Sequence, residues 1–549
     1  MDKLSLQRKE IEEVYGKISP FEFKDKLINL ADESKKSGIH TLLDAGRGNP
    51  NWISASPREA FFTFGQFAVE ESRRVWSDYD LAGMPKKEGI CKRFKAYTKK
   101  HQDDPGITLL SEMVDYGITI KKFNSDDWIF ELVDGIIGDN YPKPDRMLKH
   151  VESVVNDYLI QELSYNEEGV IKGKFKTFAV EGATAAMCYI FDTLIANNIL
   201  SKGDKIALMA PIFTPYLEIP HLPRYDFEVI EVLADETAEN GRHTWQYSSS
   251  EIHKISDSTI KALFIVNPSN PGSVAIKPET VKQLKNIVEN NNPNLMIISD
   301  DVYSTFVDDY RSLMADLPYN TIGVYSYSKY FGVTGWRLGT ISLYDDNVFD
   351  KLLKEQDEDK KGRARKRYGG ISTNPDSIAF IDRIVADSRQ VALNHTAGLS
   401  TPQQVQMAFF SLFAILDKEN RYKKLTKEIC RNRKKLLFNG LGLDLQLDPY
   451  DASYYTQFDL LEWAGRYNNV EFMHYLQANY KPVDILIRLA EESSIVLLGS
   501  SGFHGPEWAI RISLANLNDE SYSKIGQVLH KVLEDYEKEW KESKECGFI

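Results

Sequence analysis

Between residues 175 and 343, short apolar runs alternate with longer segments in which apolar residues recur every three or four positions. A nearly continuous apolar run is typical of a strand buried on both faces, and the longer spacing is typical of an amphipathic helix. Segments 183–197 and 278–289 have the helical spacing. The strand-like runs span residues 175–180, 205–209, 227–233, 260–266, 295–299, 321–325 and 337–343. This alternation predicts an α/β fold with a mostly parallel central sheet covered on both faces.

The flanking parts of the chain are mostly helical in pattern. Before the alternating region, helical spacing or an apolar pattern covers residues 6–15, 21–34, 61–74, 88–99, 107–115 and 147–163. After about residue 385 the chain returns to long helices. Residues 401–404, Thr-Pro-Gln-Gln, have the form of a capping box at a helix start, which favours a structural role. Segments 451–461 and 495–498 then predict strands of a smaller α/β layer around a helix at 483–492.

Charge and hydropathy exclude several classes of partner. The 549 residues carry a net charge of -13, so the electrostatic field of the protein repels nucleic acid and anionic lipid. The basic run 360–367 could form a nucleic-acid patch, but a solvated loop or a subunit contact is favoured. Residues 1–10 are charged, unlike a signal peptide, and no apolar run approaches the ~18 residues of a membrane helix. We expect a cytoplasmic protein that binds neither nucleic acid nor membrane.

The cysteines are scattered along the chain and show no metal-ligand spacing with each other or with histidines. They are Cys91, Cys188, Cys430 and Cys546. This distribution predicts reduced thiols and no metal site.

The segment 326–339 concentrates the candidate chemistry. Lys329 stands between small hydroxyl residues, a glycine-containing turn follows, and Arg337 lies eight residues beyond the lysine. The hydroxyls of Ser326 and Ser328 and the guanidinium of Arg337 are suitable donors to phosphate oxygens, and a lysine amine can form a Schiff base with an aldehyde. Taken alone, a Ser-x-Ser-Lys sequence is more often a solvated turn.

Other polar loops follow the predicted strands, where α/β sheets bind their ligands. Gly182, Ala183 and Thr184 join a strand to a helix, and the start of such a helix binds anions through its free N–H groups and its dipole. Further polar loops occupy 211–216, 267–273 and 300–303.

Two glycine-rich segments lie outside the central region. Gly46 and Gly48 flank Arg47, and the backbone there could approach a ligand closely, although a bare turn is the simpler interpretation. The loop 499–508 precedes Arg511, whose guanidinium fork suits a carboxylate, although a surface ion pair is the commoner role of an arginine.

The order and spacing of these motifs resemble the fold-type-I pyridoxal-phosphate enzymes of the aspartate aminotransferase superfamily. The resemblance runs from about Tyr141 to the end of the chain. It implies a large cofactor-binding domain at 136–385, a C-terminal small domain at 386–549, and an N-terminal arm, part of the small domain and an added helical region at 1–135. The smaller α/β domain is then built from both chain ends.

The resemblance also assigns roles to residues. Lys329 would form the Schiff base and move protons, and Asp300 would hold the pyridine nitrogen protonated. Arg511 would bind the substrate α-carboxylate, with Asn270, Gly48 and Arg47 as further substrate contacts. The residues that would bind the cofactor phosphate are Gly182, Ala183, Thr184, Ser326, Ser328 and Arg337. Phe213 would stack on the ring face, and Asn270 and Tyr303 would bind the phenolic oxygen. Tyr141 would reach the phosphate across a dimer interface.

A narrower resemblance, to the aspartate 4-decarboxylase family, covers nearly the whole chain. It is carried by residues 46–52, the added helical region near 56–135, and segments 141–148 and 394–404. It implies conversion of L-aspartate to L-alanine and CO2, some aminotransferase side activity, and a homo-oligomer built from dimers, with a dodecamer as a candidate size. A decarboxylase should hold the side-chain carboxylate loosely or in a desolvated pocket, because its charge disappears in the reaction.

Two alternatives share this fold. An aspartate or broad-specificity aminotransferase would keep every cofactor contact. A non-catalytic regulator with the aminotransferase fold would usually carry an added DNA-binding domain, which the acidic charge and the lack of an evident helix-turn-helix argue against.

Overall fold

The computed structural model describes residues 19–36, 42–140, 146–164, 174–239, 241–389, 398–445, 448–467 and 470–545. The helix expected at 6–15 and the predicted site residue Tyr141 lie outside these ranges.

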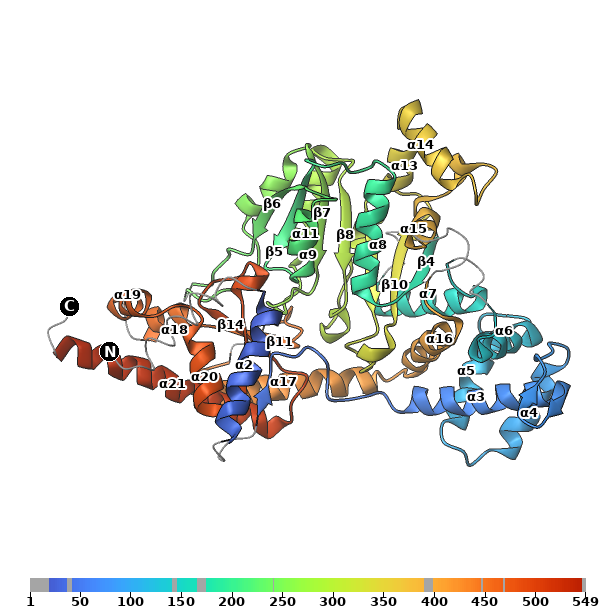
Figure 1. Ribbon diagram of the computed structural model, residues 1–549, viewed down its shortest axis with the longest axis horizontal. Coiled ribbons are helices and arrows are strands. Elements are labelled where there is room, and N and C mark those ends of the chain that lie inside the picture. Colours follow the sequence, from blue (N-terminus) through green and yellow to red (C-terminus); the bar gives the residue numbers. More distant parts are fainter. Residues whose placement is uncertain are drawn as a thin grey trace.

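A central seven-stranded sheet has the order β4-β10-β9-β8-β7-β5-β6 (Figure 1). Strands β9, β8, β7, β5 and β6 are parallel, and β10 runs antiparallel to both β4 and β9. Every predicted strand of this region is confirmed, with ends shifted by two residues or fewer. The strands are β4 (Phe175–Val180), β5 (Lys205–Ala210), β6 (Glu228–Leu233), β7 (Ile260–Val266), β8 (Met296–Asp300), β9 (Thr321–Ser326) and β10 (Gly339–Tyr344).

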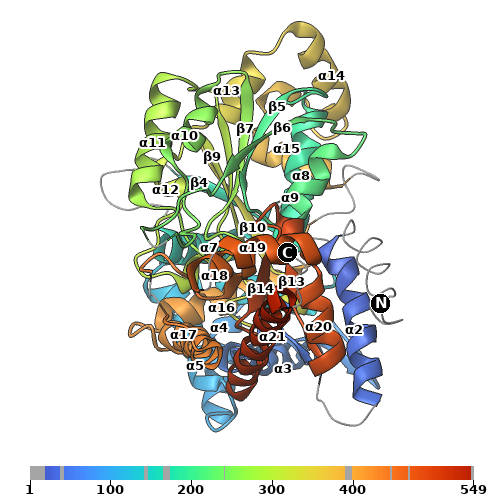
Figure 2. The same cartoon turned by 90° about the vertical axis from the view of Figure 1, so that its left-hand side faces the viewer.

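Helices cover both faces of the sheet, as the apolar strands require. In β5, Ile206 and Leu208 join one hydrophobic core, whereas Ala207 and Met209 join the core on the opposite face. Figure 2 shows α8 (Ala183–Ala196) and α15 (Phe380–Ser388) on one side. Helices α10 (Ser249–His253), α11 (Pro278–Asn290) and α12 (Leu313–Asp316) lie on the other side.

A smaller α/β layer is built from both chain ends. Its sheet has the order β11-β14-β13, and β1 pairs in parallel with β12. Leu27 of α2 and Ile485 of α20 share one core, so an N-terminal helix packs against C-terminal elements (Figure 1). The elements are α2 (Pro20–Lys36), β1 (Leu43–Asp44), α17 (Arg421–Leu441), β11 (Tyr455–Asp459), α18 (Leu460–Tyr467), α19 (Val470–Asn479), α20 (Asp484–Ser493), β12 (Ile495–Val496), β13 (Leu498–Gly499), β14 (Ala509–Ser513) and α21 (Asp519–Glu545).

The added N-terminal region is a helical cluster packed on α16 (Thr401–Leu416), at one end of the molecule in Figure 1. The Phe64 ring of α3 lies 5.7 Å from the Phe409 ring of α16. The cluster comprises α3 (Ser56–Val75), α4 (Ile90–Lys100), α5 (Ile107–Thr119) and α6 (Ser125–Ile137), with the hairpin β2 (Ser77–Asp78) and β3 (Leu81–Ala82). The other helices are α7 (Lys149–Leu163), α9 (Pro215–Glu218), α13 (Val348–Lys354) and α14 (Glu358–Tyr368).

Two local predictions were wrong. The basic run 360–367 is part of helix α14, not a loop, because Asp357 caps the helix by accepting a 2.8 Å hydrogen bond from the Lys360 N–H. The capping box at 401–404 does not form, since the N-cap is Ser400 and Thr401 is already helical. The Gln404 side chain instead accepts from the Leu148 N–H and donates to the Leu399 carbonyl.

In the described ranges, no helix is both long enough and apolar enough to span a lipid bilayer.

Helices α17 and α21 cross where Gly440 meets Gly526. A Cβ on Gly526 would collide with the Leu437 carbonyl oxygen and lie 2.9 Å from the Gly440 Cα. We therefore expect Gly526→Ala to destabilise the fold by about 1–3 kcal/mol, the cost of overpacking. In the control Gly362→Ala, on the exposed face of α14, the new Cβ meets nothing within 4 Å and should stabilise by about 0.5–1 kcal/mol. Thermal unfolding midpoints that move in the same direction for both variants would contradict this packing.

Candidate active site at the carboxyl ends of the central strands

The segment 326–339 forms a tight connection between β9 and β10. Ser326 and Gly339 are paired in register, and the Tyr327 N–H donates to the Leu338 carbonyl. The Ser326 hydroxyl donates to the Ser328 hydroxyl over 3.0 Å. Because the turn begins at the carboxyl end of a parallel strand, Lys329 points to the edge of the sheet where such folds bind ligands.

An anion-binding corner lies at the start of α8. Gly182, the N-cap of this helix, has φ +85°, and a Cβ there would collide with the Arg337 guanidinium. Arg337 also donates to the Thr334 carbonyl over 2.9 Å. The guanidinium, the helix N-terminus and the nearby hydroxyls of Ser326 and Ser328 make a set of donors suited to a phosphate group.

The Lys329 amine is hydrogen-bonded and has a lowered pKa. Its Nζ donates a 3.0 Å hydrogen bond to the carbonyl of Gly48. Burial lowers the pKa of Lys329, the positive charges of Arg511 and Arg337 lower it further, and Tyr455 and Asp300 oppose the shift. A lysine with a lowered pKa spends more time as the neutral nucleophile that Schiff-base formation requires.

Asp300 is the last residue of β8. It accepts hydrogen bonds from the Tyr216 hydroxyl over 3.1 Å and the Val302 N–H over 3.3 Å. Burial raises the pKa of Asp300 to about 6 in spite of these bonds. A carboxylate desolvated in this way is stabilised by a positively charged ligand group placed beside it.

Arg511 on β14 is a buried cation. Its side chain is 1% exposed, and it donates to the Asn270 side-chain oxygen over 3.1 Å and to the Gly46 carbonyl over 2.7 Å. Within the described ranges, Nε has no hydrogen-bond partner, and the hydrogen bonds of the guanidinium go to an amide oxygen and a carbonyl oxygen, not to a carboxylate. Burying a charge without a counter-charge is costly, so this site favours an anionic ligand.

These groups surround one cavity of about 260 Å³. The cavity brings together most of the predicted site residues, from seven segments that are separate in the sequence. These are Gly48, Ala183, Thr184, Phe213, Asn270, Asp300, Tyr303, Ser326, Ser328, Lys329, Arg337 and Arg511.

Some predicted residues lie elsewhere. Gly182 stands behind the anion corner and does not itself line the cavity. Arg47 also lies off the cavity wall: its side chain is 63% exposed, and its Nε lies 3.7 Å from the Asp44 carboxylate.

The cavity also contains side chains that the sequence interpretation missed. Phe21 of α2 packs edge-on against Phe213, with ring centroids 6.4 Å apart. Tyr455 of β11 places its hydroxyl 3.0 Å from that of Tyr303 and its ring under the Arg511 guanidinium, 4.4 Å from Cζ. The available signal was the apolar-polar alternation of 451–461, which predicts a strand but not what the strand faces.

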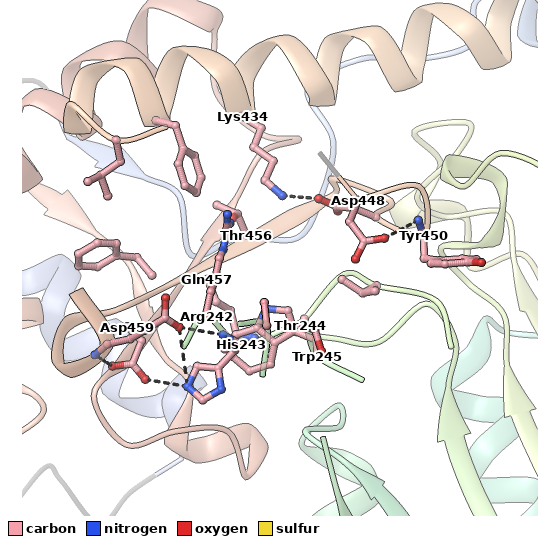
Figure 3. A pocket seen from close by; sticks show the side chains of 18 of the residues that line it. Arg242, His243, Thr244, Trp245, Lys434, Asp448, Tyr450, Thr456, Gln457 and Asp459 are labelled. Carbon is pink, nitrogen blue, oxygen red and sulfur yellow. Dashed lines mark hydrogen bonds and ion pairs between the residues drawn. The ribbon is translucent and has the colours of Figure 1, made fainter. Parts of the chain in front are cut away.

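A larger cavity of about 390 Å³ lies beside β11 and α17 (Figure 3). Several of its charged groups have partners. The His243 ring lies 3.5 Å from Asp459, Lys434 contacts Asp451, and Lys277 contacts Glu236 over 2.6 Å. Because the smaller cavity contains a buried arginine whose hydrogen bonds go only to neutral groups, it is the better candidate active site.

Comparison with known proteins shows the family of this chain. The family model described as aminotransferase class I and II matches residues 176–529. A bifunctional aspartate aminotransferase and L-aspartate beta-decarboxylase from a Pseudomonas species is 42% identical over 95% of this chain and 97% of its own length. An aspartate aminotransferase from Sulfolobus acidocaldarius is 35% identical, but over only 18% of this chain and 25% of its own length.

Solved structures share the fold. An aspartate aminotransferase from Rhizobium meliloti superposes with a TM-score of 0.58 at 15% identity, covering 94% of this chain and 96% of its own. A putative kynurenine aminotransferase from Saccharomyces cerevisiae gives a TM-score of 0.57 at 17% identity, with the same coverage of each chain.

The raised pKa of Asp300 predicts how stability depends on pH. Folding moves this pKa from 3.8 to about 6, so the folded state binds the proton more tightly than the unfolded chain. The resulting stability is present below pH ~4 and is lost as the pH rises through ~6. Asparagine cannot ionise, so Asp300→Asn should not show this loss. In the absence of cofactor, the free energy of unfolding of the variant relative to wild type should therefore increase by about 1–3 kcal/mol as the pH rises from 4.5 to 8.

Urea unfolding of both cofactor-free proteins at these two pH values measures this difference. Buried Asp301, whose pKa burial raises to about 7, has the same direction of pH dependence but is present in both proteins. A stability difference that does not change with pH would show that Asp300 is not desolvated in the folded protein.

Proposed function

Because the chain belongs to the class I and II aminotransferase family, we propose that it converts L-aspartate to L-alanine and CO2, with aspartate aminotransferase side activity. The observation that carries this proposal is similarity along 95% of the chain to a protein named for both activities, including the added helical region. Enzymes of this family use pyridoxal phosphate.

The residues of the cavity fit this cofactor. Arg337, Ser326, Ser328 and the start of α8 form an anion corner of suitable chemistry for the phosphate. Asp300, with its raised pKa, would be relieved by the protonated pyridine nitrogen. Phe213 would cover the ring, and Asn270 and Tyr303 would bind its phenolic oxygen. Tyr141, outside the described ranges, remains a predicted phosphate contact across a dimer interface.

The bound cofactor supplies an electron sink conjugated with the substrate Cα. Arg511 would bind the α-carboxylate of the substrate, which provides the counter-charge that the buried guanidinium lacks. Lys329 would take the Cα proton, pass it to the neighbouring cofactor carbon, and later reverse both transfers. Its lowered pKa suits both directions, because the amine must accept and return a proton near neutral pH.

The way in which the side-chain carboxylate of the substrate is bound decides between decarboxylation and transamination. A bidentate arginine would stabilise the charge that must disappear when CO2 leaves, and so would favour transamination. Among the described cavity residues, Arg511 and Arg337 are the arginines, and the α-carboxylate and the phosphate would occupy them. This arrangement favours decarboxylation.

The aminotransferase alternative is supported by the aspartate aminotransferases among the relatives and solved structures. We also propose a cytoplasmic homo-oligomer built from dimers, with a dodecamer as a candidate size. The non-catalytic regulator is the third alternative, and a cofactor absorption band without turnover would support it.

The decisive assay incubates pure protein with L-aspartate and pyridoxal phosphate and no keto acid. We expect sustained CO2 release with one alanine formed per CO2, because a decarboxylase regenerates its cofactor form in each cycle. The control Lys329→Ala should be at least about 100-fold slower. Product formation that stops after one turnover per site would instead identify an aminotransferase.

Arg47 remains our candidate for steering the side-chain carboxylate. In the structure it is exposed and faces Asp44, so a contact with substrate would be a partly solvated one. Such contacts contribute about 0.5–1 kcal/mol, and this one would stabilise the carboxylate charge that must disappear with CO2, so Arg47→Ala should raise the ratio of alanine formation to transamination by about twofold to fivefold. The matched control is Arg421→Ala, an exposed arginine 2.7 Å from Glu419. An unchanged ratio in Arg47→Ala would remove Arg47 from this role.

A further inference from the structure

Two protic side chains that line the cavity have no role in the mechanism above. The phosphate, the pyridine nitrogen, the phenolic oxygen and the α-carboxylate account for the hydroxyl, carboxyl, amide and arginine groups near them. Among the described lining residues, this leaves the hydroxyl of Tyr455 and that of Thr334, whose carbonyl holds Arg337 in the anion corner. Tyr455 stands at the other end, beside Lys329 and Arg511.

The proton balance of the proposed reaction favours a second acid. Lys329 takes one proton from Cα and gives the same proton to the cofactor side before CO2 leaves. It is therefore a neutral amine when the side-chain carbon must be protonated, and a neutral amine has no acidic proton to give. Overall, CO2 is replaced by a proton from solvent, and a second protic group beside the side-chain carbon would deliver it without first recharging the lysine.

We propose that Tyr455 is this acid: its hydroxyl protonates the substrate carbon from which CO2 has departed. The proposal rests on the decarboxylase function proposed above and adds a catalytic residue to it.

The position of Tyr455 supports this role. A Cβ placed on Gly48 would collide with the Tyr455 hydroxyl and would lie 3.3 Å from the Lys329 Nζ, so both groups face the same point above Gly48. The ring of Tyr455 lies beneath the Arg511 guanidinium. Tyr455 thus connects the amine that acts at Cα with the cation that would hold the α-carboxylate, and the side-chain carbon is bonded directly to Cα.

The backbone around Tyr455 is rigid. Its N–H and that of Tyr454 both donate to the Ser273 hydroxyl, over 3.1 and 3.0 Å. The residue is 2% exposed, and the Tyr303 ring packs edge-on against it at 5.4 Å. A group fixed in this way can protonate its target carbon from one side only.

Tyr455 has polar neighbours on its ring face and at its hydroxyl. The Arg511 guanidinium lies 4.4 Å from the ring centre, and the Tyr303 hydroxyl lies 3.0 Å from that of Tyr455. In the step itself the C–C bond to the carboxyl group breaks and CO2 leaves. The electron pair, held for a moment in the conjugated system, forms a C–H bond with the Tyr455 proton. The phenolate then takes a proton from water.

The test compares Tyr455→Phe with wild type in the holoenzyme. The substrate is L-aspartate stereospecifically deuterated at the side-chain carbon, turned over in tritiated water, so that the alanine methyl group carries three hydrogen isotopes and reports the face of protonation. The same samples are assayed for the half-reaction that forms oxaloacetate. The matched control is Tyr97→Phe, which removes another buried hydroxyl, bonded to the Thr63 carbonyl in the added helical region.

We expect wild type and Tyr97→Phe to give one methyl configuration. Tyr455→Phe should release CO2 about 100-fold more slowly, keep the oxaloacetate half-reaction within about threefold, and give a racemic or inverted methyl group. The retained half-reaction shows that the variant is folded and binds cofactor.

Four results would overturn the proposal. A wild-type configuration in Tyr455→Phe, or CO2 release at the wild-type rate, would show that another group is the acid. Equal loss of both reactions would show that Tyr455 only positions Arg511. If wild type itself released no CO2, the proposed function would fail and the role of Tyr455 with it.

Discussion

The buried guanidinium of Arg511 joins the parts of the chain that make the site. It extends from a strand of the small sheet, bonds the Asn270 side chain in a loop of the central sheet, and bonds the Gly46 carbonyl in the N-terminal segment. A cation removed from water must be compensated, and here only dipoles compensate it within the described protein. The fold therefore brings three distant segments together around a charge that an anionic ligand would complete.

The other charges of the cavity follow from this arrangement. Arg511 and Arg337 add positive charge to the enclosed space around Lys329, and this charge adds to the lowering of the lysine pKa by burial. Asp300 lines the same cavity, and burial raises its pKa. The site is thus divided into a region that attracts anionic groups and a point that attracts a cationic one, the distribution expected for a zwitterionic cofactor and an acidic substrate.

The added helical region also contributes to the lysine loop. Arg58, in the first turn of α3, donates to the Gly332 carbonyl over 2.7 Å, and the nearby Trp52 indole donates to the Tyr330 carbonyl over 3.1 Å. The backbone after Lys329 is therefore held by residues that precede it by more than two hundred positions in the sequence. This links an apparent elaboration of the fold to the precision of the lysine position.

Local sequence determined the strands, most helices and the chemistry of the loops, because a buried parallel strand must be apolar throughout and a phosphate corner needs small and basic residues. It did not determine the start of α16, where Gln404 bonds Leu148 and Leu399 in place of a capping box. Nor did it identify Tyr455. Register places Tyr455 opposite Ser513 and Gln457 opposite Arg511, so Tyr455 and Arg511 share a face of the small sheet. Such a neighbourhood arises only when strands distant in sequence pair, because period-two alternation shows that a strand has two faces but not what either face meets.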